Sequence, residues 1–219
     1  MLDGRALGSS RARELVVEAV EAAATLMAEP AVAHAWDRPS VLEGMSIGAL
    51  CAHLLRAAGA TIAYLDRTPA DREAGVEPLT AVTYFRAAVE APIHDRIKEV
   101  SAAESAIGPS ETAAACRSLT GRLAERLADE PEDRLVAALG DRTLTLDDFC
   151  RTRLIEVLLH LDDLARSVGV PTPETDPEGR AVVVDILIGI ARDRVGDWPL
   201  IHALARRERL AGDPPFPVF

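Results

Sequence analysis

Glu156 and His160 stand four residues apart in the stretch RTRLIEVLLHLDDLA (151–165), where most neighbouring residues are apolar. On a helix, side chains four residues apart lie one above the other, so a single cation can bridge this carboxylate and this imidazole. His53, in LCAHLLRA (50–57), is the other histidine in a strongly apolar helical setting. Two histidines and one carboxylate form a ligand set of catalytic zinc and non-haem iron sites, which keep a further coordination position open. These residues are candidates for a divalent-metal site that zinc, iron or nickel could occupy.

The charges around this stretch predict that Glu156 and His160 face inward. Successive residues of a helix are rotated by about 100° around its axis, which gathers several charged residues in one sector of this helix. Only Ile155 interrupts that sector, which is expected to face solvent. That sector comprises Asp148, Arg151, Asp162 and Arg166. Glu156 and His160 lie outside it, flanked by Arg153 and Asp163. Because a buried carboxylate needs a hydrogen bond, an ion pair or a metal, an Arg–Glu–His hydrogen-bond network is an equal alternative on residue chemistry alone.

The elements that must position these residues are helices. Apolar periodicity predicts long helices over 11–28, 47–65 and 108–128, and over the stretch that contains Glu156. Ser46 is the expected N-cap of the second, and Thr145 or Asp147 the N-cap of the fourth. Four long helices with little strand signal predict an all-α fold, an antiparallel four-helix bundle that spans residues 1–168.

The remaining segments are predicted to connect or extend this bundle. Residues 80–107 have helical periodicity, which Pro92 should divide or kink. Residues 135–146 alternate around Gly-Asp and predict a short hairpin. After Gly169, a proline-rich connector leads to two further helical stretches, at about 179–195 and 199–209, so residues 169–219 are predicted to form a short helical carboxyl-terminal extension.

Composition limits the classes of partner. The net charge of −11 and the pI near 4.9 argue against nucleic acid, whose phosphates are bound mainly by basic residues. No apolar run approaches the roughly 20 residues that a membrane span needs. The three cysteines are widely spaced, which supports neither a disulfide framework nor a cysteine zinc site and indicates a reducing cytoplasm.

Three segments of the chain carry a resemblance to a known family. WDRPSVLEGMSIGALCAHLL, TRLIEVLLHLDDLARSVG and RVGDWPLIHALARRERL resemble, in order and spacing, signatures of the DinB-like mycothiol-dependent maleylpyruvate isomerase family, in particular its shorter actinobacterial members. The resemblance implies a DinB-type four-helix bundle with a divalent metal, usually zinc, on His53, Glu156 and His160, and mycothiol as thiol cofactor. Met45 stands where the family often has tryptophan. The part after Gly169 is shorter than the second domain of the isomerases proper, so the isomerase substrate itself is not implied.

The leading hypothesis is a metalloenzyme that binds a low-molecular-weight thiol as thiolate and presents it to a small electrophilic molecule, for thiol transfer or thiol-assisted isomerisation. Arg153 is a candidate for holding a substrate carboxylate, with an internal ion pair as its alternative. Asp163 is a candidate for orienting a ligating histidine, with a helix-surface interaction as its alternative. Metal-dependent hydrolysis by bound hydroxide and a non-enzymatic binding or dimerisation bundle are the competing functions, and the sequence leaves a homodimer open.

Overall fold

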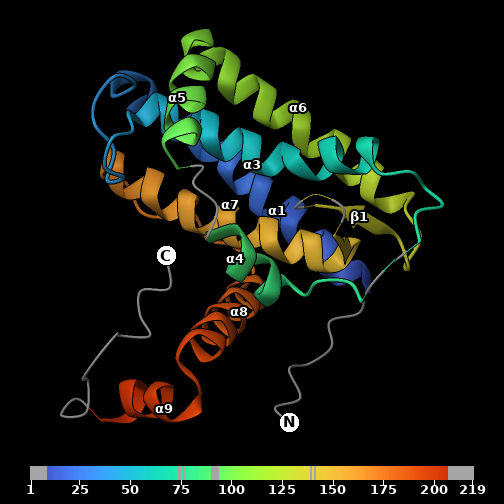
Figure 1. Ribbon diagram of the computed structural model, residues 1–219. Helices are drawn as coiled ribbons and strands as arrows, with labels where there is room; N and C mark the ends of the chain where they lie inside the picture. Colours follow the sequence, from blue (N-terminus) through green and yellow to red (C-terminus); the bar gives the residue numbers. More distant parts are fainter. Residues whose placement is uncertain are drawn as a thin grey trace.

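Four long helices form the body of the protein: α1 (Ser9–Met27), α3 (Ile47–Arg67), α6 (Pro109–Ala128) and α7 (Leu146–Val168). Helices α1 and α3 each pack against both α6 and α7 (Figure 1). The computed structural model describes residues 9–73, 75, 77–89, 94–138, 140 and 142–206, with the backbone alone for residues 9, 10, 89, 94 and 95. The predicted all-α bundle is confirmed.

Polar and aromatic contacts show the directions in which these helices run. Near the start of α1, Arg13 donates from Nε to Asp147 Oδ1 at 2.9 Å, at the start of α7, and from Nη1 to the carbonyl of Leu127 at 3.3 Å, at the end of α6. Helices α1 and α7 therefore run in the same direction, and α6 runs against both. The ring of Tyr64, near the end of α3, lies 5.2 Å from that of Phe149, near the start of α7. Helix α3 is therefore antiparallel to α7, so its first half faces the second half of α7.

Side-chain caps define where the two site-bearing helices begin. Ser46 Oγ accepts a hydrogen bond from the amide of Ala49 at 3.1 Å, as the sequence predicts for the start of α3. At the start of α7, Thr145 Oγ1 accepts from the amide of Asp148 at 3.1 Å, so Thr145 rather than Asp147 is the cap. Helix α7 ends at Gly169, whose φ of 74° favours glycine because other residues are strained there.

Helix α3 is mostly buried, but one of its faces borders a cavity. Leu50, Leu54 and Leu65 are fully buried in the bundle core, whereas His53, Ala60 and Tyr64 are half-buried. The apolar run at 47–65 is therefore not enclosed on every side. The expectation that no apolar run approaches the length of a membrane span is corrected for α3, whose 21 residues qualify as a candidate span by length and composition. More than half of its apolar window, 56%, is buried inside the protein, where α3 packs against α5, α6 and α7. Its apolar character therefore belongs to the bundle core.

Short elements close the bundle around α3 and α7. The predicted helical region 80–107 consists of α4 (Ala81–Val89), α5 (His94–Glu104) and the 3-10 helix η1 (Ser105–Ile107), and Pro92 lies outside the described residues. Helix α4 packs on α7, and α5 packs on α3. Helix α2 (Pro30–His34) follows α1, and the predicted hairpin is confirmed as antiparallel strands β1 (Leu135–Ala137) and β2 (Thr143–Thr145).

Two helices follow the bundle. Helix α8 (Pro177–Val195) packs against α4, α7 and α1, and α9 (Asp197–Ala205) packs against α8. Figure 1 shows both helices extending away from the bundle. The predicted helix at 179–195 is thus confirmed with its start at Pro177. The one predicted at 199–209 spans Asp197–Ala205, and its final predicted residues, 207–209, lie outside the described chain. The division of the chain at 168/169 stays a prediction.

Candidate metal centre

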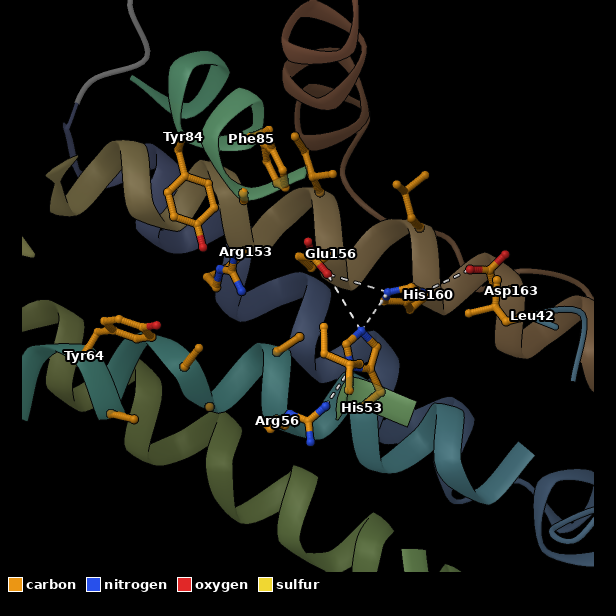
Figure 2. A pocket seen from close by; sticks show the side chains of 18 of the residues that line it. Leu42, His53, Arg56, Tyr64, Tyr84, Phe85, Arg153, Glu156, His160 and Asp163 are labelled. Atoms are coloured by element: carbon orange, nitrogen blue, oxygen red, sulfur yellow. Dashed lines mark hydrogen bonds and ion pairs between the residues drawn. The ribbon is translucent and has the colours of Figure 1, made fainter. Parts of the chain in front are cut away.

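The antiparallel packing of α3 and α7 brings His53 together with Glu156 and His160 (Figure 2). The Nε2 atoms of the two histidines lie 3.1 Å apart. Glu156 Oε2 lies 3.6 Å from His160 Nε2 and 3.9 Å from His53 Nε2. All three side chains are half-buried. Three potential ligand atoms, contributed by two helices, therefore converge on one point.

These separations match the geometry of a metal site. Tetrahedral zinc with bonds of about 2.0–2.1 Å keeps its ligand atoms roughly 3.3–3.4 Å apart. The three observed separations, 3.1, 3.6 and 3.9 Å, bracket that value. The donor set also has the composition of catalytic rather than structural zinc sites, since three protein ligands leave a position for another molecule. The residues present therefore fit a divalent metal.

Asp163 contacts the far side of the His160 ring. Its Oδ2 lies 3.1 Å from His160 Nδ1, one turn further along α7. Burial lowers the pKa of His160, but the hydrogen bonds with Asp163 and Glu156 outweigh it and raise that pKa to about 9. A carboxylate that accepts from Nδ1–H orients the ring and directs Nε2 toward the ligand position. The geometry thus suits Asp163 for the orienting role.

Arg56 contacts the corresponding nitrogen of His53 with the opposite polarity. Its Nη2 lies 3.1 Å from His53 Nδ1, and its guanidinium also donates to Ser101 Oγ and Glu104 Oε2, both at 2.9 Å. A guanidinium only donates, so Nδ1 is the acceptor in this contact. A neutral His53 that binds a metal through Nε2 carries its proton on Nδ1. Metal binding and the Arg56 contact therefore compete, and Ser101 and Glu104 can retain Arg56 when it leaves His53.

Charge and burial act differently on the two remaining ligands. Burial lowers the pKa of His53, as does the positive charge of His160, and together they bring it to about 4. Burial raises the pKa of Glu156, but the hydrogen bond from His160 and the charge of Arg153 outweigh it and lower that pKa to about 2. At neutral pH His53 is therefore uncharged and Glu156 is ionised, which are the forms that bind a metal.

The three side chains lie in the wall of a cavity of about 980 Å³. Its other walls come from the Ala-rich face of α3, from Tyr84 and Phe85 on α4, and from Leu42 and Met45 in the segment before α3. Arg153 also lines it. A molecule in this cavity can reach the point at which the three ligand atoms meet.

Residues 16–165 match the family model of the mycothiol maleylpyruvate isomerase N-terminal domain, over more than half of the chain. The chain belongs to this family. Searches among curated proteins and among solved structures find no match. The matched range begins within α1 and stops three residues before the end of α7, and it includes every residue of the candidate centre. Met45, at the position where family members often have tryptophan, borders the cavity rather than the bundle core alone.

Sequence reasoning found the three candidate ligands and Asp163 but missed other residues of the site. Arg56 follows His53 by three residues, a helical spacing that could have indicated the contact. Tyr84 and Phe85 come from α4, and no periodicity within 80–107 shows that α4 packs on α7 beside Glu156. Arg153 lies beside Glu156, as the helical periodicity of this stretch predicts. Among the described residues, however, it makes no ion pair with Glu156 or Asp163 (Figure 2).

Proposed function

We propose that this protein is a metal-dependent enzyme that activates a low-molecular-weight thiol, mycothiol, for reaction with a small electrophilic molecule. The observation that carries the proposal is the convergence of His53, Glu156 and His160 in the wall of an open cavity rather than in a closed core. A divalent metal, with zinc as the first choice, supplies a Lewis acid there that lowers the pKa of a bound thiol to below neutrality.

The chain's own residues then have distinct roles. His53, Glu156 and His160 hold the metal, and Asp163 keeps the His160 ring oriented through the Nδ1 contact at 3.1 Å. The apolar cavity walls pack against the apolar part of the electrophile. Arg153 holds an anionic group of the electrophile. Transfer of the thiol to the electrophile, or its addition and later elimination with isomerisation, are the reactions that this arrangement serves.

The cysteines of this chain support the need for an external thiol. Cys51, Cys116 and Cys150 are all buried, and burial raises the pKa of Cys116 to about 11 and those of the other two to about 12. None of them lines the cavity. Buried thiols of high pKa are poor nucleophiles, so a thiol-dependent reaction at this centre requires a thiol from solution. Three unpaired thiols also fit the reducing cytoplasm that we propose as the compartment.

Metal analysis combined with a thiol-dependent assay tests this function. The purified protein should contain close to one equivalent of divalent metal, and the His53→Ala and His160→Ala variants should lose it. His34→Ala is the matched control, because His34 is exposed and lies outside the cavity. A panel of electrophiles should be consumed only when mycothiol is present, and only by the metal-loaded wild type and the control.

Two outcomes would favour the competing functions. Turnover without thiol would identify a metal-dependent hydrolase instead. Absence of stoichiometric metal, with melting temperatures unaffected by zinc or chelator, would identify the contacts among Arg56, His53, His160 and Asp163 as a structural hydrogen-bond network in a binding or dimerisation bundle. Sedimentation of the wild type tests the homodimer separately.

A further inference from the structure

Arg153 is a buried cation that contacts no carboxylate directly within the described part of the chain. It is 8% exposed, and its Nε donates to Thr152 Oγ1 at 3.1 Å. Its guanidinium carbon lies 5.2 Å from the ring centre of Phe149 and 5.9 Å from that of Tyr84. No carboxylate oxygen of the described residues lies within 4.0 Å of its nitrogens. A buried charge of this kind is costly unless another group compensates it.

The other buried arginines show how this chain usually compensates such a charge. Arg13, also 8% exposed, pairs with Asp147 at 2.9 Å and donates to backbone carbonyls of the segment after α6. Arg134, 3% exposed, pairs with Glu130 at 2.8 Å and donates to the carbonyls of Thr68 and Pro69. Arg153 differs from both because its guanidinium borders the cavity. The charge of Arg153 lowers the pKa of Glu156, one turn further along α7, but no carboxylate of the described residues contacts its guanidinium directly. An anion that enters the cavity from solution can therefore pair with it.

The walls beyond Arg153 are mostly apolar. The face of α3 that borders the cavity consists largely of small residues, Ala57, Gly59, Ala60 and Ala63. Phe85 and Ala88 of α4, Ile97 of α5 and Leu159 of α7 add further apolar lining, whereas Tyr64, Arg67 and Tyr84 add polar groups. A volume of about 980 Å³ is at the upper end of the range for cavities that enclose a drug-sized ligand. These walls favour an aromatic or aliphatic body and offer few partners to a second polar group.

From these observations we propose that the cavity binds a carboxylic acid with a large apolar body, whose carboxylate pairs with Arg153 while the body lies against α3 and α4. Arg153 precedes Glu156 by three residues on α7, about one helical turn, so the bound carboxylate lies beside the candidate metal centre. This assignment rests on the proposed function only in naming the bound acid as the electrophilic substrate. The binding site itself depends on Arg153 and the apolar walls.

Fluorescence titration with dansyl-labelled undecanoate tests this proposal. The matched ligand is the primary amide of the same compound, which keeps the apolar body and removes the charge. Both are titrated into metal-free and zinc-loaded full-length protein. The wild type should bind the acid roughly 10- to 150-fold more tightly than the amide, as expected for a charge-assisted pair in a buried site.

Three variants separate the carboxylate from the apolar body. Arg153→Met should lose the preference for the acid and keep the affinity for the amide. Arg151→Met is the matched control, because Arg151 lies on the same helix, pairs with Asp148 at 3.1 Å and does not line the cavity. It should retain the preference. Ala60→Phe should weaken both ligands at least about tenfold by filling the cavity, and it leaves Arg153 untouched, so it tests the site even if Arg153→Met does not fold.

Equal affinity of the wild type for acid and amide, no binding of either, or a preference for the acid that survives Arg153→Met would each overturn the proposal. These outcomes differ from failure of the proposed function. Acid binding without stoichiometric metal or thiol-dependent turnover would retain the carboxylate site and refute the enzyme. Thiol-dependent turnover of neutral electrophiles, without acid binding, would retain the enzyme and refute the substrate class.

Discussion

Replacing Arg56 with methionine should tighten metal binding, although Arg56 is in direct contact with a candidate ligand. Mutations around a metal centre usually weaken it, because neighbouring groups orient the ligands. Arg56 is expected to act in the opposite sense, since its Nη2 donates to the nitrogen of His53 that must carry a proton when Nε2 binds a metal. The variant removes this competing donor and a positive charge near the metal.

The magnitude follows from the contact that metal binding has to break. A hydrogen bond to a charged group contributes about 1.5–3 kcal/mol to a folded protein. The Arg56–His53 contact, at 3.1 Å and half-buried, belongs to this class. If metal binding replaces it with repulsion between the guanidinium and the cation, Arg56→Met should lower the Kd for zinc by roughly 10- to 150-fold.

Competition with a fluorescent zinc chelator at neutral pH measures this change. Glu104→Gln is the control, because it leaves the Arg56–His53 contact in place and removes the carboxylate, 2.9 Å from Arg56 Nη1, that can retain the displaced guanidinium. This control should bind zinc no more tightly than the wild type. An Arg56→Met variant with unchanged or weaker zinc affinity would show that the Arg56 contact does not compete with metal binding for Nδ1 of His53.

Four further changes have defined expectations. The pKa of His160 is raised to about 9 in the metal-free protein, so zinc must displace a proton from this histidine at lower pH. Calorimetry should therefore show an apparent zinc affinity that rises about tenfold per pH unit from neutrality and levels off above pH 9. Asp163→Ala should weaken zinc binding by roughly 10- to 100-fold at pH values above 9. The effect should be smaller at neutral pH, because there zinc must also displace the proton that Asp163 helps to hold on His160 of the wild type. An equal loss of zinc affinity at both pH values would contradict this expectation. Thr61→Val should stabilise the fold by about 1 kcal/mol and raise the Tm by roughly 2–4 °C, since Thr61 Oγ1 is buried without a hydrogen-bond partner among the described residues, and a lower Tm would count against it. Gly48→Ala should lower the free energy of unfolding, measured by urea denaturation, by about 1–3 kcal/mol, because the added Cβ would lie 2.6 Å from the Trp36 ring. An unchanged free energy of unfolding would show that the ring can move freely.

Local patterns in the sequence were sufficient for the helices and for one side of the candidate centre. Apolar periodicity predicted the four long helices, and the capping residues Ser46 and Thr145 lie where the structure has them. The approach of Glu156 and His160 also required only the sequence, because a helix places residues four apart on one face whatever surrounds it. The position of Asp163 beside His160 follows from the same local geometry.

Periodicity shows which face of a helix is apolar but not which helix packs against that face, nor at what height along its axis. His53 is 107 residues from His160, and only the antiparallel packing of α3 on α7 brings their Nε2 atoms to 3.1 Å. Packing of α5 on α3 likewise decides that Arg56 also donates to Ser101 and Glu104, and the packing around α7 decides that Arg153 borders a cavity. The residue types of a metal centre were thus readable along the chain. Its ligand separations and its access to solvent, in contrast, depend on contacts between distant helices, which arise from the fit of side chains in the folded core.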